Sequence, residues 1–153
     1  LRGGRMSTKA IRISILVLAG LLLCFLALTT LTEKSDGAVE LQNNLSLNVA
    51  NGDISFFKDT HGGFLGDGDA SAVFTASEEN AVLIEQNWRA DFSDEGVLHI
   101  LFGESGVFTS FGYVLPKNGL FYFKDFSSAH SINFVFAVYD PADRTVYYCR
   151  FDT

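Results

Sequence analysis

Two stretches decide the fold of this chain: INFVFAVY, residues 132–139, and TVYYCRF, residues 145–151. Both are rich in β-branched and aromatic residues, and the five residues between them, DPADR, contain the proline and aspartates typical of turns. The pattern therefore predicts a β-hairpin. Side chains alternate between the two faces of a strand, and both faces of residues 132–139 are apolar. We expect a sheet that is at least partly covered on both sides.

Further strands are predicted on the amino-terminal side of this hairpin. Residues 45–49 and 54–57 alternate apolar and polar side chains or are largely apolar, and they flank Asn51-Gly52, a dipeptide typical of tight hairpin turns. A turn is also predicted at residues 116–119, which contain Pro and Asn-Gly. The remaining predicted strands are residues 72–75, 97–102, 113–115 and 120–123.

One helix is predicted after Ser77, a good N-cap residue that is followed by two glutamates in the first turn. Ala81, Ile84 and Trp88 then recur at spacings of three and four, which places them on one helix face. Together these patterns predict an α+β fold, mainly an antiparallel β-meander with one packed helix.

The amino-terminal part of the chain has a different composition. Residues 1–12 contain four basic and no acidic residues, and residues 13–31 contain no charged residue at all. About 20 apolar residues span a bilayer core. We therefore expect a cytoplasmic basic head (1–12), a transmembrane signal anchor (13–32), a tether (33–37) and an extracytoplasmic α+β domain (38–153). A cleaved signal peptide is the alternative, although its apolar region is usually shorter, at about 7–15 residues. Met6 is the expected translation start.

The charge of the chain limits the partners of the predicted domain. From Glu33 onward there are 18 acidic and seven basic residues, a net charge of −11. Nucleic acid is not an expected partner because phosphate binding needs clustered Lys and Arg. Small cations and basic proteins are compatible with this charge. Only two cysteines are present, Cys24 in the apolar segment and Cys149, so we expect Cys149 to be buried and unpaired.

The most unusual segment is DTHGGFLGDGD, residues 59–69, which holds three carboxylates and a histidine. One interpretation is a divalent cation site with Asp59, His61, Asp67 and Asp69 as ligands, because hard cations need several converging oxygens. The alternative is a strand-connecting loop whose aspartates accept backbone hydrogen bonds. In either case four glycines would shape the loop: Gly62, Gly63, Gly66 and Gly68.

Motifs for catalysis are few. The chain has no G-x-S-x-G nucleophile elbow, phosphate-binding loop or dinucleotide fingerprint. His99 lies in an apolar run, so we interpret it as a packed core residue, and we place His130 in a loop. Cys149 has aromatic and basic neighbours in the last strand, where a structural thiol is expected.

The order of these segments resembles a family. The loop Asp-x-His-Gly-Gly-Phe-x-Gly-Asp-Gly, a Trp after a short helix, the turn and strand at residues 112–123 and the final hairpin follow one another. In this respect residues 54–153 resemble uncharacterised small bacterial proteins with an amino-terminal membrane segment. The resemblance implies location and fold, and no activity is attached to it.

Two hypotheses about function follow. The first is a membrane-anchored, extracytoplasmic binding or interaction module with an unknown ligand, which rests on the predicted anchor, the acidic domain and the missing catalytic motifs. The alternative is a metal-dependent hydrolase that uses the His61 and Asp loop. Both place the functional surface at residues 59–69.

Overall fold

The computed structural model describes residues 8–61 and 68–152. The chain divides into two compact units, residues 1–33 and 34–153. The first helix, α1 (Thr8–Leu45), has its carboxyl-terminal part in the second unit. Residues 33–37, expected as a tether, are helical within it. Across the described residues, no helix combines the length and apolar character that a membrane crossing needs.

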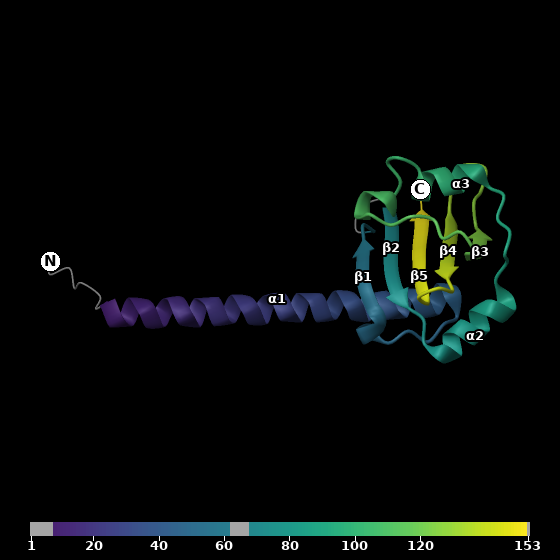
Figure 1. Cartoon of the computed structure of the whole chain (residues 1–153). Coiled ribbons are helices and arrows are strands. Elements are labelled where there is room, and N and C mark those ends of the chain that lie inside the picture. The colour runs from purple at the N-terminus through teal and green to yellow at the C-terminus, as the bar shows by residue number, and fades with distance from the viewer. Residues whose placement is uncertain (1–7, 62–67, 153) are drawn as a thin grey trace. The chain divides into compact units, whose positions relative to one another are not determined.

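The second unit is an α+β domain built on one five-stranded sheet (Figure 1). All neighbouring strands are antiparallel, and their order in the sheet is β1-β2-β5-β4-β3. Consecutive strands are neighbours except at the centre, where β2 pairs with β5. The strands are β1 (Ile54–Asp59), β2 (Gly68–Thr75), β3 (Leu120–Asp125), β4 (Phe134–Asp140) and β5 (Thr145–Asp152).

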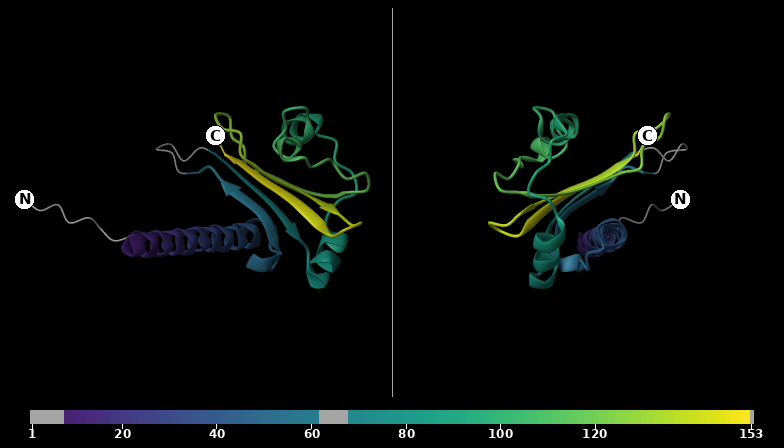
Figure 2. Two further views of the ribbon diagram at one scale, coloured as in Figure 1. Left: turned by 60° about the vertical axis from the view of Figure 1, so that its left-hand side comes forward. Right: turned by 90° about the vertical axis from the view of Figure 1, so that its right-hand side faces the viewer.

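The predicted hairpin at residues 132–151 is confirmed as β4 and β5, and the sheet is covered on both faces, as expected. Odd-numbered residues of β4, such as Val135 and Tyr139, pack in one core with Leu41 of α1 and Ile84 of α2. Phe136 and its even-numbered neighbours pack in a second core against α3. Figure 2 shows these helices on opposite sides of the sheet.

Helix α2 (Glu78–Asn87) is the helix that the sequence predicts. The Ser77 side chain accepts a hydrogen bond from the Asn80 backbone N–H, which satisfies one of the free amides of the first turn. Ala81 and Ile84 are buried against the sheet, while Trp88 caps the end of the helix and is partly buried. The predicted capping and apolar face are both confirmed.

The predicted strand at residues 97–102 is wrong, because this run forms helix α3 (Glu95–Phe102). Asp94 is its N-cap and accepts a hydrogen bond from the Val97 backbone N–H. Val97 and Leu101, four residues apart, are buried on the sheet. A short run that is apolar at nearly every position fits a strand and a helix equally well, so the N-cap distinguishes the two. His99 is consequently exposed on the helix, which corrects its interpretation as a core residue.

The predicted strand at residues 45–49 is also wrong. Leu45 ends α1, and Ser46 takes a positive φ of 57° that terminates the helix. Leu47 and Val49 are buried, but their segment is not part of the sheet. Asn51–Asp53 forms a short 3-10 helix, η1, in place of a hairpin turn. The alternation of apolar and polar residues therefore reflects the burial of an extended segment that is not a strand of the sheet.

Of the four other predicted strands, three are confirmed and one is wrong. Residues 54–57, 72–75 and 120–123 lie in β1, β2 and β3, and a turn precedes β3. Residues 113–115 form no strand and follow a second 3-10 helix, η2 (Thr109–Phe111). Tyr113 instead donates its backbone N–H to the Phe108 carbonyl, and its side chain packs against the second core.

Candidate functional site

The predicted site at residues 59–69 is described at its two ends. Asp59 ends β1, and Gly68 and Asp69 begin β2. The Thr60 hydroxyl contacts the Asp69 carboxylate at 2.9 Å and accepts a hydrogen bond from the Asp69 backbone N–H at 2.8 Å. A Cβ on Gly68 would lie 2.9 Å from the His61 backbone nitrogen, so this close pairing requires glycine. The other members of the predicted site, Gly62, Gly63, Gly66 and Asp67, lie outside the described residues.

His61 is held between two carboxylates from different strands. Its Nδ1 lies 2.6 Å from Asp59 Oδ1, and its Nε2 lies 3.0 Å from Asp152 Oδ2 on β5. The Nε2 atom is buried, and its orientation toward Asp152 is not that of a hydrogen bond. The Asp59 carboxylate also accepts the His61 backbone N–H at 2.7 Å, as in an Asx-turn. The structure thus brings Asp59 and His61 together and adds Asp152, which the sequence did not indicate.

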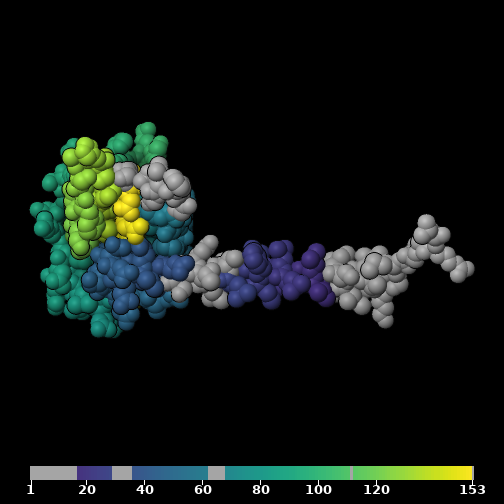
Figure 3. Space-filling view, turned by 180° about the vertical axis from the view of Figure 1, so that it is seen from behind, coloured from purple at the N-terminus to yellow at the C-terminus, as the bar shows by residue number. Residues whose placement is uncertain are grey.

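Two ion pairs link Asp152 to α1 through Arg150. Arg150 lies 2.9 Å from Asp152 and donates to both oxygens of Glu40 at 2.8 Å. Glu40 also accepts hydrogen bonds from the Tyr148 hydroxyl at 2.7 Å and from the Asn44 amide at 2.9 Å. Figure 3 shows this end of α1, in blue, next to the yellow end of β5. Glu40 therefore ties the helix to the central strand.

This cluster is mostly buried, which perturbs its titratable groups. Burial, followed by the hydrogen bond to Glu40, raises the pKa of Tyr148. Burial alone would lower the pKa of Arg150, but the neighbouring carboxylates of Glu40 and Asp152 raise it overall. The carboxylates are thus already engaged with protein cations and donors. Within the described residues, no group of three or more His, Cys, Asp or Glu side chains is arranged to hold a metal ion. The cation site, which includes Asp67, stays a prediction.

Cys149 is buried and forms no disulfide, as the sequence predicts. Its sulfur lies 3.9 Å from the Ser71 hydroxyl, and burial raises the pKa of the thiol to about 12. The reactive thiolate is therefore scarce at neutral pH. We expect slow labelling of native Cys149 by a maleimide and much faster labelling in urea. A Cys24→Ser variant isolates this signal, and rapid labelling of that variant under native conditions would contradict the burial.

A second candidate site, which the sequence did not reveal, lies along the outer edge of the sheet at β3. There the backbone of Phe121 is paired with that of Arg89, with N–H···O distances of 2.7 and 3.0 Å. In an antiparallel strand, alternate residues direct their backbone groups to the same side. Phe123 and Asp125 therefore direct their N–H and C=O groups to the open side, and within the described residues these groups have no backbone partner.

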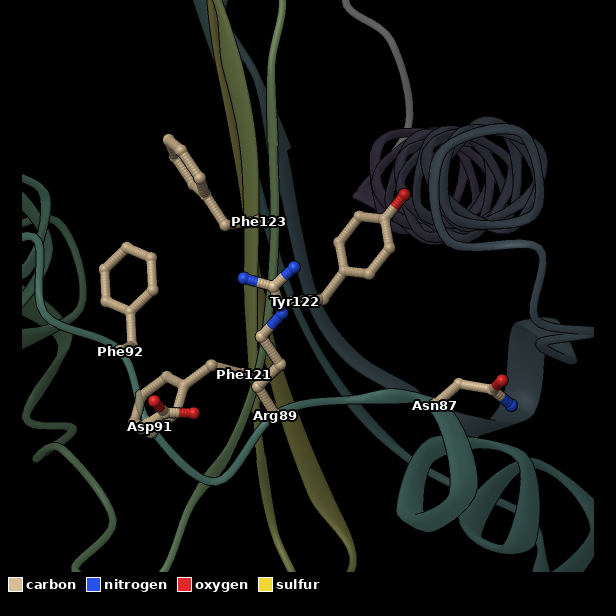
Figure 4. Close-up of a pocket in the computed structure, with 7 residues that line it drawn as sticks. All are labelled: Asn87, Arg89, Asp91, Phe92, Phe121, Tyr122 and Phe123. Carbon is tan, nitrogen blue, oxygen red and sulfur yellow. The ribbon is translucent and has the colours of Figure 1, made fainter.

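Three hollows follow this open edge, and we call them together the β3 groove. The edge hollow, of about 220 Å³, is lined by four aromatic side chains and by the polar residues Asn87, Arg89 and Asp91. The Arg89 guanidinium lies between Tyr122 and the phenylalanines (Figure 4). A hollow of about 320 Å³ on the α2 side shares Tyr122 with it. A hollow of about 260 Å³ on the α3 side shares Phe123. Neighbouring β3 residues thus join the hollows on the two faces of the sheet.

The edge hollow is held in shape by aromatic packing. The Phe92 ring lies 5.7 Å from that of Phe121, 5.4 Å from that of Phe123 and 5.2 Å from that of Phe136. On the other side of the sheet, Trp88 lies 5.7 Å from Tyr122. The walls of the groove are therefore continuous with both cores. A preformed groove of this kind binds with little loss of side-chain freedom.

No family model, no curated protein and no solved structure matches the chain. The fold and the two candidate sites are thus the basis for any inference about function.

Proposed function

We propose that the chain is a membrane-anchored, extracytoplasmic module that binds a partner through its α+β domain. The anchor is supported by residues 13–31, which carry no charge and follow a basic segment. In the described part of this segment, the large apolar side chains between Val17 and Leu28 are each more than half exposed. Exposed apolar surface of this extent is typical of a segment that contacts lipid or another protein.

The β3 groove is the observation that carries the binding function. It combines aromatic walls, hollows on both faces of the sheet, and backbone groups of Phe123 and Asp125 that have no backbone partner among the described residues. These are features of interaction surfaces. By contrast, His61 lies between the carboxylates of Asp59 and Asp152, and Cys149 is buried with a raised pKa. His61 and Cys149 are thus engaged in structure.

The hydrolase alternative predicts a different result. A metal-dependent enzyme would retain a transition metal after purification and would lose it in a His61→Ala variant. The binding module requires no such metal. Metal analysis of the purified chain and of this variant therefore separates the two functions.

The orientation in the membrane gives a direct test of the proposal. Basic residues such as Lys9 and Arg12 favour retention of the amino terminus in the cytoplasm, so residues from Glu33 onward should be exported. In cells stripped of outer layers, added protease should digest the domain and spare an amino-terminal tag. Digestion of the domain only after rupture of the cytoplasmic membrane would contradict the proposed location.

A further inference from the structure

The backbone groups at the open edge of β3 favour the binding of an extended peptide. Phe123 and Asp125 present backbone donors and acceptors at strand spacing, and the matching partner is the backbone of another strand. A helix has its own backbone groups paired and cannot fill this ladder. Arg89 already demonstrates that the edge accepts antiparallel pairing, because it forms an isolated bridge with Phe121.

The same bridge limits where an added strand can run. An incoming strand can pair with Asp125 and Phe123 but has to stop before Phe121, where Arg89 occupies the edge. In the antiparallel direction its carboxyl end is the one that arrives there. The Arg89 side chain is exposed beside this point. Asp91 lines the same hollow, but none of the ion pairs among the described residues includes Arg89. A guanidinium in this place matches a terminal carboxylate.

The side chains beside the edge define two further positions of such a strand. A residue opposite Phe123 points to the α3 side, where Ile100 and Phe134 line an apolar hollow. A residue opposite Asp125 points to the same side, toward the carboxylates of Asp94 and Asp125. Hydrogen bonds from Ser127 lower the pKa of Asp125, so that carboxylate is charged at neutral pH. The first position favours an apolar residue and the second a basic one, in accord with the net charge of −11.

We infer that the β3 groove binds the carboxyl-terminal strand of a partner protein, with an apolar last residue opposite Phe123 and a basic residue two positions earlier opposite Asp125. The inference rests on the proposed binding function and specifies its ligand class. The partner adds a sixth strand to the sheet, its backbone pairs with Phe123 and Asp125, and Arg89 receives its terminal carboxylate.

The test uses the full chain and the synthetic peptide acetyl-Thr-Val-Lys-Thr-Leu with a free carboxyl terminus. Trp88 is the single tryptophan of the chain and lies beside the groove, so its fluorescence reports binding. We expect saturable binding that is about tenfold weaker for the peptide amide, which lacks the terminal charge. The Arg89→Gln variant should lose about the same factor with the acid peptide and almost nothing with the amide.

Two controls isolate the strand geometry. Lys58→Gln removes an exposed basic residue on β1, at the opposite edge of the sheet, and should leave binding unchanged. Methylation of the terminal leucine nitrogen removes the donor to the Phe123 carbonyl without altering the protein, and should abolish binding. Absence of saturable binding, or binding that is insensitive to amidation, to Arg89→Gln or to N-methylation, would overturn the inference. A dimer of the chain that buries β3 and excludes the peptide would overturn it as well.

A failure of this inference can be distinguished from a failure of the proposed function. Protease accessibility tests the location of the domain without any peptide. If the domain is exported and site-specific cross-linkers at residues of the β3 groove capture a partner, but no peptide binds, the ligand assignment fails alone. If the domain is cytoplasmic, the proposed function fails whatever the peptides do.

Discussion

Replacing Phe136 with Ala is expected to lower the free energy of unfolding by about 3–5 kcal/mol. Phe136 is fully buried near the middle of β4, and its ring lies 5.2 Å from that of Phe92 and 6.2 Å from that of Phe121. These rings come from three separate segments, so the cavity left by truncation cannot be filled by one neighbour. Urea denaturation of the full chain, followed by circular dichroism, measures the loss.

Phe126→Ala is the matched control for this change. The Phe126 side chain is 46% exposed, so the same truncation should cost less than about 1 kcal/mol. A comparable loss at both positions would contradict the assignment of Phe136 to a packed core. The comparison also bears on function, because Phe136 supports Phe92 and Phe121, which form the wall of the edge hollow.

The sequence predicted best the elements whose signals are local. The hairpin of β4 and β5 has two apolar runs and a turn with Pro141, and α2 has both an N-cap at Ser77 and an apolar face. In these segments propensity, pattern and turn residues agree. The sequence also predicted that both faces of β4 are at least partly covered, because Val135 and Phe136 point to opposite faces and both are apolar.

The wrong predictions share a physical cause. Residues 97–102 are apolar except for His99, so strand and helix fit them equally well, and the Asp94 cap distinguishes the two. Residues 45–49 alternate correctly for a strand, but Leu45 is four residues from Leu41 and completes the buried face of α1. Tertiary burial, which the local pattern does not specify, decided both segments.

Local sequence patterns were also insufficient to predict the candidate sites in full. Asp59 and His61 are two residues apart, so their pairing follows from local geometry. Asp152, more than 90 positions away, joins them because β2 pairs with β5 and places Gly68 opposite Asp152. The β3 groove depends on strand order, since a strand is open only when it lies at the edge of the sheet. No local motif encodes that order.

The second large effect is expected at the pair of Arg150 and Glu40. Replacing Arg150 with Met should lower the free energy of unfolding by about 2–4 kcal/mol, because the Glu40 carboxylate would stay buried without its cation. The side chains of Arg150 and Glu40 are only 25% and 15% exposed, so water can replace the lost partner only in part. Loss of Arg150 also removes the link to Asp152 and, through it, to His61.

The exposed pair of Arg144 and Glu78 provides the control. Their atoms lie 4.0 Å apart and their side chains are 46% and 95% exposed, so Arg144→Met should change stability by less than about 1 kcal/mol. The double variant Arg150→Met, Glu40→Gln should recover part of the loss, because it leaves no unpaired charge.

The pH dependence of the free energy of unfolding tests the role of Tyr148 in the same cluster. Its raised pKa means that the folded state holds the hydroxyl proton more tightly than the unfolded state does. The contribution of Tyr148 to the free energy of unfolding is fully present below about pH 10, the pKa of an unperturbed tyrosine. It is lost as the pH rises above that value. Stability should therefore fall more steeply above pH 10 in the natural chain than in a Tyr148→Phe variant. Equal slopes in the two proteins, together with an additive double variant, would show that Glu40 does not act as the buried acceptor that joins α1 to β5.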